Sequence, residues 1–166
     1  ILLALLIALS LTSCNLFQKE SEAEKLLNKI EAERITDSIL KNAGKNIYLD
    51  STGMEGSPVK VTSAKMVTQE YSNYKNIRLK YKNVSDKTIE AIRFEWYGEN
   101  SFGEPADMGA GLIDGVGGGF SETKLSPNAT SSGEWSIYSK DGKKILMARA
   151  YEVAFSDGTK WKLRNN

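Results

Sequence analysis

Residues 77–82 of this chain read Ile77-Arg78-Leu79-Lys80-Tyr81-Lys82, a strict alternation of apolar and charged side chains. A period of two is the pattern of a β-strand with one buried face and one face in water. Turn-forming residues follow at 83–87, and residues 89–96 then alternate again, with Ile92, Phe94 and Trp96 on one face. We therefore expect these two segments to form an antiparallel pair.

The same strand texture continues toward the C-terminus. Residues 59–67, 134–138 and 145–155 are further strand candidates, and the Asp157-Gly158 turn leads into a last apolar segment. Many short strands at turn-sized spacing predict a mainly β protein, an antiparallel β-sandwich or barrel. Because the chain has one cysteine, no intramolecular disulfide can form, and we expect the core alone to hold the fold. Its large side chains are expected to be Phe94, Trp96, Trp135, Tyr151, Phe155 and Trp161.

One group of motifs carries a family resemblance. Phe94-Glu95-Trp96-Tyr97-Gly98 lies after Asn83-Val84-Ser85 and before Gly103-Glu104-Pro105. This layout resembles the FxLYD type of bacterial lipoprotein domain, with Trp96 in place of the Leu and Gly98 in place of the Asp. The resemblance covers roughly residues 59–163 and implies an immunoglobulin-like β-sandwich. It implies no catalytic residues, because such sandwiches host unrelated functions.

A charged segment with a different sequence pattern precedes the strands. Residues 19–43 are rich in charge and contain neither Pro nor Gly; Ser21 and Glu24 have the form of a capping box, and Gly44 offers a stop. This predicts a helix over about residues 22–43. Its apolar residues fall on two opposite faces, Ala23, Leu26, Leu27 and Ile30 on one and Ile35, Ile39 and Ala43 on the other. A coiled-coil seam does not drift in this way, so we expect two short helices or a loosely ordered stalk, acting as a spacer or as a partner-binding helix.

The N-terminal residues predict export. Residues 1–9 are an uncharged run of Ile, Leu and Ala, shorter than the roughly 20 apolar residues of a transmembrane helix. The run leads into Leu11-Thr12-Ser13-Cys14, which resembles the bacterial lipobox. In such motifs the chain is cut before the cysteine, and the cysteine carries diacylglycerol. We therefore expect residues 1–13 to be a signal peptide and Cys14 to be lipidated, unless the run is a buried helix and Cys14 a core thiol.

Two details extend this prediction. The printed sequence has neither an initial Met nor a basic n-region, so we expect the start of the signal peptide to lie upstream. Asn15, rather than Asp, follows the cysteine. By the enterobacterial sorting rule this favours the outer membrane or the cell surface over the inner membrane.

The search for reactive groups gives mostly exclusions. The chain has no histidine, which removes the commonest general base and most transition-metal sites. With Cys14 assigned to lipid, a thiol nucleophile is also excluded. We expect no cofactor, no metal and no catalytic residues; a Ser-Lys or carboxylate pair in a small hydrolase is the alternative. The net charge of +1, without a block of like charge, gives no reason to expect a nucleic-acid partner.

The Gly-rich connection from Ser101 to Phe120 is where we expect any ligand contact, since a rigid sandwich displays function on its loops. Asp107 and Asp114 lie in it and could bind Ca²⁺, but their spacing is not that of an EF-hand. No helical pattern or suitably placed Lys accompanies the glycines, so a phosphate-binding loop is not expected. A mobile surface loop is the simpler interpretation.

The sequence thus predicts three segments. Residues 1–13 are a signal peptide, 14–44 a lipidated N-terminus with a helical spacer, and 45–166 an immunoglobulin-like β-sandwich. We expect a non-enzymatic binding or assembly module of the cell envelope whose partner is a protein or glycan. Asp37-Ser38-Ile39 and Asp50-Ser51-Thr52 also resemble acceptor sites for bacterial O-glycosylation.

Overall fold

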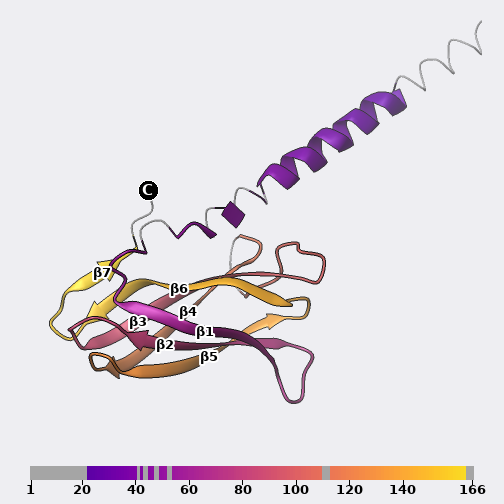
Figure 1. The fold of residues 1–166 in the computed structure, drawn as a ribbon. Helices are drawn as coiled ribbons and strands as arrows, with labels where there is room; N and C mark the ends of the chain where they lie inside the picture. The colour runs from indigo at the N-terminus through magenta and orange to yellow at the C-terminus, as the bar shows by residue number, and fades with distance from the viewer. Residues whose placement is uncertain are drawn as a thin grey trace, which may run out of the picture. The chain divides into compact units, whose positions relative to one another are not determined.

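The structure, a computed structural model, describes residues 22–40, 42, 45–46, 49–51, 54–109 and 113–163. It divides into two units, with the boundary after Asn42. The first contains the helix and the second contains seven strands (Figure 1). The strands are β1 (Val59–Thr68), β2 (Lys75–Asn83), β3 (Ile89–Glu99), β4 (Val116–Leu125), β5 (Thr130–Ser139), β6 (Lys144–Phe155) and β7 (Lys160–Lys162).

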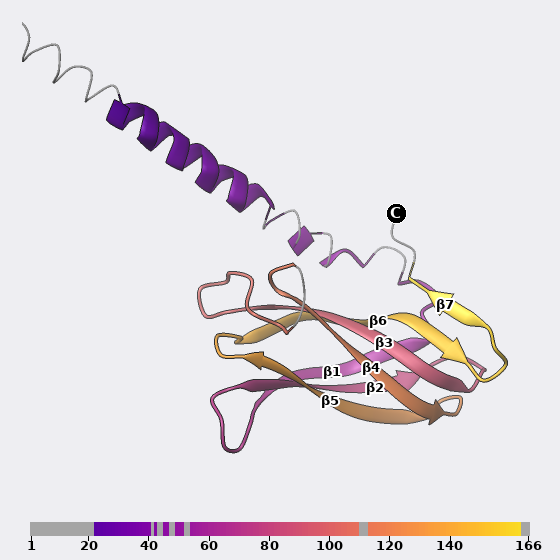
Figure 2. The ribbon, with the colours of Figure 1, turned by 180° about the vertical axis from the view of Figure 1, so that it is seen from behind.

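The strands form two antiparallel sheets with the orders β1-β2-β5 and β4-β3-β6-β7. Figures 1 and 2 show the sheets as two layers facing each other. If the seven strands are given the immunoglobulin letters A, B, C, C′, E, F and G in chain order, the sheets are A-B-E and C′-C-F-G. The pairings of β2 with β5 and of β3 with β6 are Greek-key connections. The predicted immunoglobulin-like β-sandwich is confirmed.

Aromatic and branched side chains from both sheets fill the space between the layers. Tyr81 of β2 and Phe94 of β3 have ring centroids 4.8 Å apart, and Trp96 and Trp135 have centroids 5.8 Å apart. The buried residues of the core are Val59, Ile77, Leu79, Tyr81, Ile89, Ile92, Phe94, Trp96, Ala106, Met108, Leu125, Ile137, Ala150, Val153 and Phe155. The predicted alternation of 77–82 and 89–96 therefore identifies the inward faces correctly.

The Asn83-Val84-Ser85 turn has a clear structural role. The Asn83 side chain is fully buried, and its amide nitrogen donates to the carbonyl oxygens of Lys87 and Leu125, at 2.8 and 2.9 Å. Its Oδ1 atom accepts the backbone N–H and the hydroxyl of Ser85. A buried amide with both ends bonded fixes the β2–β3 turn to the end of β4.

The Gly-rich connection differs from the expected loop. Val116–Phe120 belong to strand β4, and the segment before them folds back on β3, where the Gly98 N–H donates to the Gly115 carbonyl at 2.9 Å. Ala106 and Met108 of this connection are buried in the core. A Cβ on Gly117 would lie 2.0 Å from the Met108 carbonyl oxygen, so only glycine leaves room for the connection. The glycines at 117–119 serve close packing within a strand, so the interpretation as a surface loop was wrong for this part of the connection, whereas residues 101–104 are exposed.

Two described residues before β1, Lys45 and Asp50, contact the four-stranded sheet. Lys45 forms an ion pair with Glu99 at the end of β3. Arg149 of β6 donates from Nε to Glu95 of β3, at 2.6 Å, and from a terminal nitrogen to the Asp50 carbonyl oxygen, at 2.5 Å. These contacts explain why Arg149 is only 5% exposed on a face that the strand pattern alone leaves in water.

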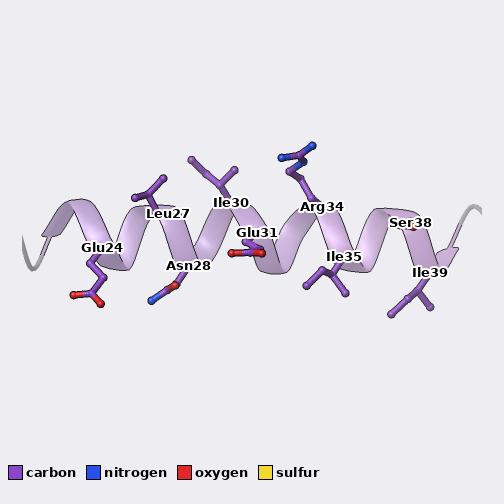
Figure 3. A pocket seen from close by; sticks show the side chains of 9 residues that line it. All are labelled: Glu24, Leu27, Asn28, Ile30, Glu31, Arg34, Ile35, Ser38 and Ile39. Atoms are coloured by element: carbon purple, nitrogen blue, oxygen red, sulfur yellow. The ribbon is translucent and has the colours of Figure 1, made fainter.

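Residues 22–40 form one continuous helix, so the expectation of two short helices or a loosely ordered stalk was wrong. The predicted cap residue Ser21 and stop residue Gly44 lie outside the described residues. Leu27 and Ile30 project to one side of the helix and Ile35 and Ile39 to the other (Figure 3), which agrees with the predicted drift of the apolar positions. No described helix is both long enough and apolar enough to cross a bilayer.

Candidate functional site

The most prominent exposed aromatic group lies at one end of the three-stranded sheet. The β1–β2 hairpin is closed by the Gln69 N–H donating to the Tyr74 carbonyl at 3.0 Å, and the Tyr74 N–H donates to the Ser72 hydroxyl at 2.9 Å. This bonded turn holds Tyr71, which is 93% exposed. A large apolar ring on an ordered turn is available to a partner at little entropic cost.

Tyr138 near the end of β5 completes the group. Its ring meets that of Tyr74 edge to face, with centroids 5.9 Å apart, and Lys140 Nζ lies 5.0 Å from the Tyr74 centroid. We call Tyr71, Tyr74, Tyr138 and Lys140 the tyrosine cluster. Tyr138 has a φ of +52° and is 66% exposed. A left-handed backbone costs a non-glycine residue roughly 1–2 kcal/mol, and such strain in an exposed aromatic residue is typical of functional positions.

A hydrogen-bonded network of polar side chains adjoins the cluster. The Gln69 amide donates to Asn76 at 2.7 Å and to Ser136 at 3.0 Å, and the Asn76 amide donates to Glu134 at 2.7 Å. Arg78 donates from Nε to the other oxygen of Glu134 at 2.8 Å. The hydrogen bond from Asn76, followed by that from Arg78, lowers the pKa of the Glu134 carboxyl. This carboxylate therefore stays ionised and bonded, and it is not placed as a general acid.

The outer surface of the four-stranded sheet carries a small hollow. Its lining includes Ala91, Phe120 and Ala154, together with Arg93 and Glu152, which form an ion pair at 3.1 Å. Its volume is about 120 Å³, well below the several hundred cubic ångströms of a typical ligand pocket. The hollow can take one side chain, but it does not bring two carboxylates together.

A larger hollow of about 790 Å³ follows the helix. Its lining comes from the helix alone and comprises Glu24, Leu27, Asn28, Ile30, Glu31, Arg34, Ile35, Ser38 and Ile39 (Figure 3). All these side chains are exposed. Exposed side chains of one helix, which project to both of its sides, enclose nothing, so this hollow is no active-site cleft.

Two titratable groups of the sandwich bear on the hydrolase alternative. The hydrogen bond that Lys45 donates to Glu99, more than any other contact, raises the pKa of Lys45. Burial raises the pKa of the Tyr97 phenol, whose ring lies against Gly115. A lysine that acts as a general base needs a lowered pKa, and a tyrosine that acts as a nucleophile also needs a lowered pKa. Both groups are shifted in the opposite direction, so neither is prepared for base or nucleophilic catalysis.

The sequence-predicted residues are distributed as follows. Leu11, Thr12, Ser13 and Cys14 lie outside the described residues. Asp107 accepts the N–H of Gly109 at 3.2 Å, and Asp141 accepts the N–H of Asp107 at 3.2 Å, so these carboxylates support the local turn. Within the described ranges, no three carboxylate, His or Cys side chains gather as metal ligands.

The candidate acceptor sites for glycosylation are only partly described. Ser38 lies on the exposed surface of the helix. Asp50 and Ser51 are exposed beside the sandwich, and Thr52 is outside the described residues. The use of either site stays a prediction.

Known proteins resemble this chain only weakly, and the resemblance is in structure. No family model and no curated protein matches this chain, so the FxLYD resemblance stays a prediction. The fold is similar to a hypothetical protein of Peptoclostridium difficile 630, with 9% identity and a TM-score of 0.47 over 63% of this chain and 86% of that one. It is also similar to the trimeric lipoprotein SadB of Salmonella enterica, with 14% identity and a TM-score of 0.33 over 91% and 90% of the two chains. Likeness at these levels carries no functional argument.

Proposed function

We propose that this chain is a lipoprotein of a bacterial cell envelope and that its sandwich is a non-enzymatic binding or assembly module. The anchor is lipid on Cys14, and the proposed location is the outer membrane or the cell surface. The support for the anchor is the sequence itself, an apolar run leading into Leu11-Thr12-Ser13-Cys14. Two or three acyl chains, at about 0.8 kcal/mol per buried methylene, hold a protein on a bilayer.

The tyrosine cluster is the observation that carries the binding role. A binding module presents an exposed aromatic surface, whereas an enzyme presents a pocket with converging groups of shifted pKa. The sandwich presents an exposed aromatic surface, with Tyr71 on an ordered turn and Tyr138 in a strained backbone conformation. The proposed partner of the cluster is an envelope protein or glycan.

The anchor is tested by the intact mass of the protein purified from a bacterial membrane. We expect the mass of residues 14–166 plus acyl chains, and we expect Cys14→Ala to be found without acyl mass in the soluble fraction. A wild-type protein that keeps Ile1 and lacks acyl mass would contradict the anchor. In that case the apolar run would belong to the folded protein.

The binding role is tested by placing a photoreactive amino acid at position 71 and, as a control, at position 102 of the membrane-bound protein. Phe102 is a matched control because it is 88% exposed on a different loop. We expect a discrete cross-linked partner from position 71 and not from position 102. Sedimentation with purified envelope glycan covers a partner that is not a protein.

The second arm of this test uses Tyr138→Gly. Glycine accepts a positive φ, so we expect the free energy of unfolding to change by less than about 1 kcal/mol. Capture of the partner should nevertheless fall about tenfold, as for an aromatic contact residue. Unchanged capture by Tyr138→Gly, together with equal cross-linking from positions 71 and 102, would remove the tyrosine cluster from the proposal.

A further inference from the structure

The pairing of β1 with β2 gathers lysines on the outer surface of the three-stranded sheet. Lys60 lies opposite Lys82, and Lys65 lies opposite Arg78, while Lys80 lies between these pairs opposite Ser63. The neighbouring positions point into the core, as the buried Leu79 and Tyr81 show. We call Lys60, Lys65, Arg78, Lys80 and Lys82 the lysine face.

The charge of this face is not balanced. Strands β1, β2 and β5 contain a single acidic residue, Glu134. Its carboxylate is already bonded to Arg78, at 2.7 Å, and to Asn76. None of Lys60, Lys65, Lys80 and Lys82 has an ion-pair partner among the residues that the structure describes. Strands β1, β2 and β5 contain six Lys and Arg residues, the five of the lysine face and Lys75, against one carboxylate, whereas the whole chain has a net charge of only +1.

This arrangement works against the fold. Like charges directly opposite each other on neighbouring strands destabilise a sheet. Arg78 of the Lys65–Arg78 pair is compensated by Glu134, but no described ion pair compensates the Lys60–Lys82 pair. Such a break of a local rule is typical of a functional surface.

The chemistry of the face indicates the kind of partner. Four of the five cations are lysines, which act as separate point charges, and the one Arg is already paired with Glu134. Such a surface is suited to a broad field of anionic groups and not to two-point recognition of one phosphate. The exposed rings of Tyr71 and Tyr138 lie at one end of the same sheet, and tyrosines are enriched where proteins meet the headgroup layer of a bilayer.

We infer that the lysine face docks on a bilayer that contains anionic phospholipid. A lipid anchor and a basic protein surface can act together in membrane attachment, the first through buried acyl chains and the second through anionic headgroups. The inference rests on the proposed function for the presence of a nearby bilayer. The electrostatic contact itself does not require the lipid on Cys14, so the two can fail separately.

The test uses residues 14–166 carrying Cys14→Ser, which removes the acyl chains and keeps every described residue. Binding is measured by co-sedimentation with phosphatidylcholine vesicles, with and without phosphatidylglycerol. We expect binding only when phosphatidylglycerol is present. Raising the salt concentration to about 1 M, where the screening length is near 3 Å, should abolish it.

Two charge-matched variants locate the contact. The first replaces Lys60, Lys65, Lys80 and Lys82 with Gln, and the control replaces Lys124, Lys143, Lys144 and Lys162, which are exposed elsewhere on the sandwich. At roughly fivefold per lysine, the first variant should bind at least a hundredfold more weakly and the control much less so. The first variant should also have a Tm at least as high as the parent chain, because two like-charge pairs are gone.

Equal losses in the two variants would overturn the inference, because they would show an effect of net charge alone. Binding of polyphosphate or duplex DNA through the same lysines, with no binding to vesicles, would also overturn it in favour of a soluble polyanion. If these vesicle results hold while Cys14 proves unlipidated, the docking surface stands and the proposed anchor fails.

Discussion

Replacing Arg149 with Met is expected to lower the free energy of unfolding by about 3–5 kcal/mol, the usual cost of breaking a buried ion pair. Arg149 is 5% exposed and donates to Glu95 at 2.6 Å and to the Asp50 carbonyl at 2.5 Å. The variant leaves the Glu95 carboxylate without its cation under the segment that precedes β1. Urea denaturation measures the loss, and faster hydrogen exchange near Asp50 should accompany it.

Two comparisons make this prediction specific. Adding Glu95→Leu to Arg149→Met should recover part of the stability, because it removes the uncompensated carboxylate. Arg93→Met breaks the neighbouring exposed pair with Glu152, at 3.1 Å, and should cost no more than about 1 kcal/mol. If Arg149→Met were no more harmful than Arg93→Met, the segment before β1 would not be held on the sheet by this arginine.

Much of the fold follows from the sequence because side-chain alternation is a local property. The pattern of 77–82 identifies the buried residues Ile77, Leu79 and Tyr81 without knowledge of their partners. The strand pattern failed at β4, where glycines at 117–119 carry no side chains to alternate. The reason for these glycines is tertiary: a Cβ on Gly119 would lie 2.8 Å from the Trp135 ring. No local signal in the sequence shows that contact.

The surfaces were less predictable than the core. The alternation of β2 already places Arg78, Lys80 and Lys82 on one face, but the sequence does not show that β1 brings two more lysines beside them. A net charge near zero therefore concealed a concentrated basic surface. The burial of Ala106 and Met108 in the expected ligand loop also had no signal in the sequence, and a ligand contact in that loop stays a prediction.

The tyrosine cluster had no sequence signal. Tyr71 and Tyr74 lie in the β1–β2 hairpin, more than 60 residues from Tyr138 in the chain, and Tyr74 meets Tyr138 only because β2 pairs with β5. A positive φ at Tyr138 is also unexpected from sequence, since this conformation is typical of Gly and Asn. The predicted lipobox is the opposite case, because a linear motif of this kind depends on local sequence alone; it stays a prediction.

Trp96→Ala is expected to lower the free energy of unfolding by about 3–5 kcal/mol, the range for removing a buried tryptophan. The Trp96 ring is fully buried, lies 5.8 Å from the Trp135 ring and donates from Nε1 to the Met108 carbonyl at 3.4 Å. The substitution leaves a cavity in the core and removes one of the hydrogen bonds that hold the β3–β4 connection. Denaturation in urea measures the loss.

The same variant tests how the connection is held. If Trp96 secures it, the amides of Ala106 and Gly115, which are bonded to Gly98 and Ala106, should exchange faster in Trp96→Ala than the global loss of stability explains. Phe102→Ala, at the exposed tip of the connection, should change stability by less than about 0.5 kcal/mol and leave those amides protected. Exchange that rises uniformly across all strands would show instead that Trp96 supports the whole core, and that the connection stays on β3 through its backbone bonds.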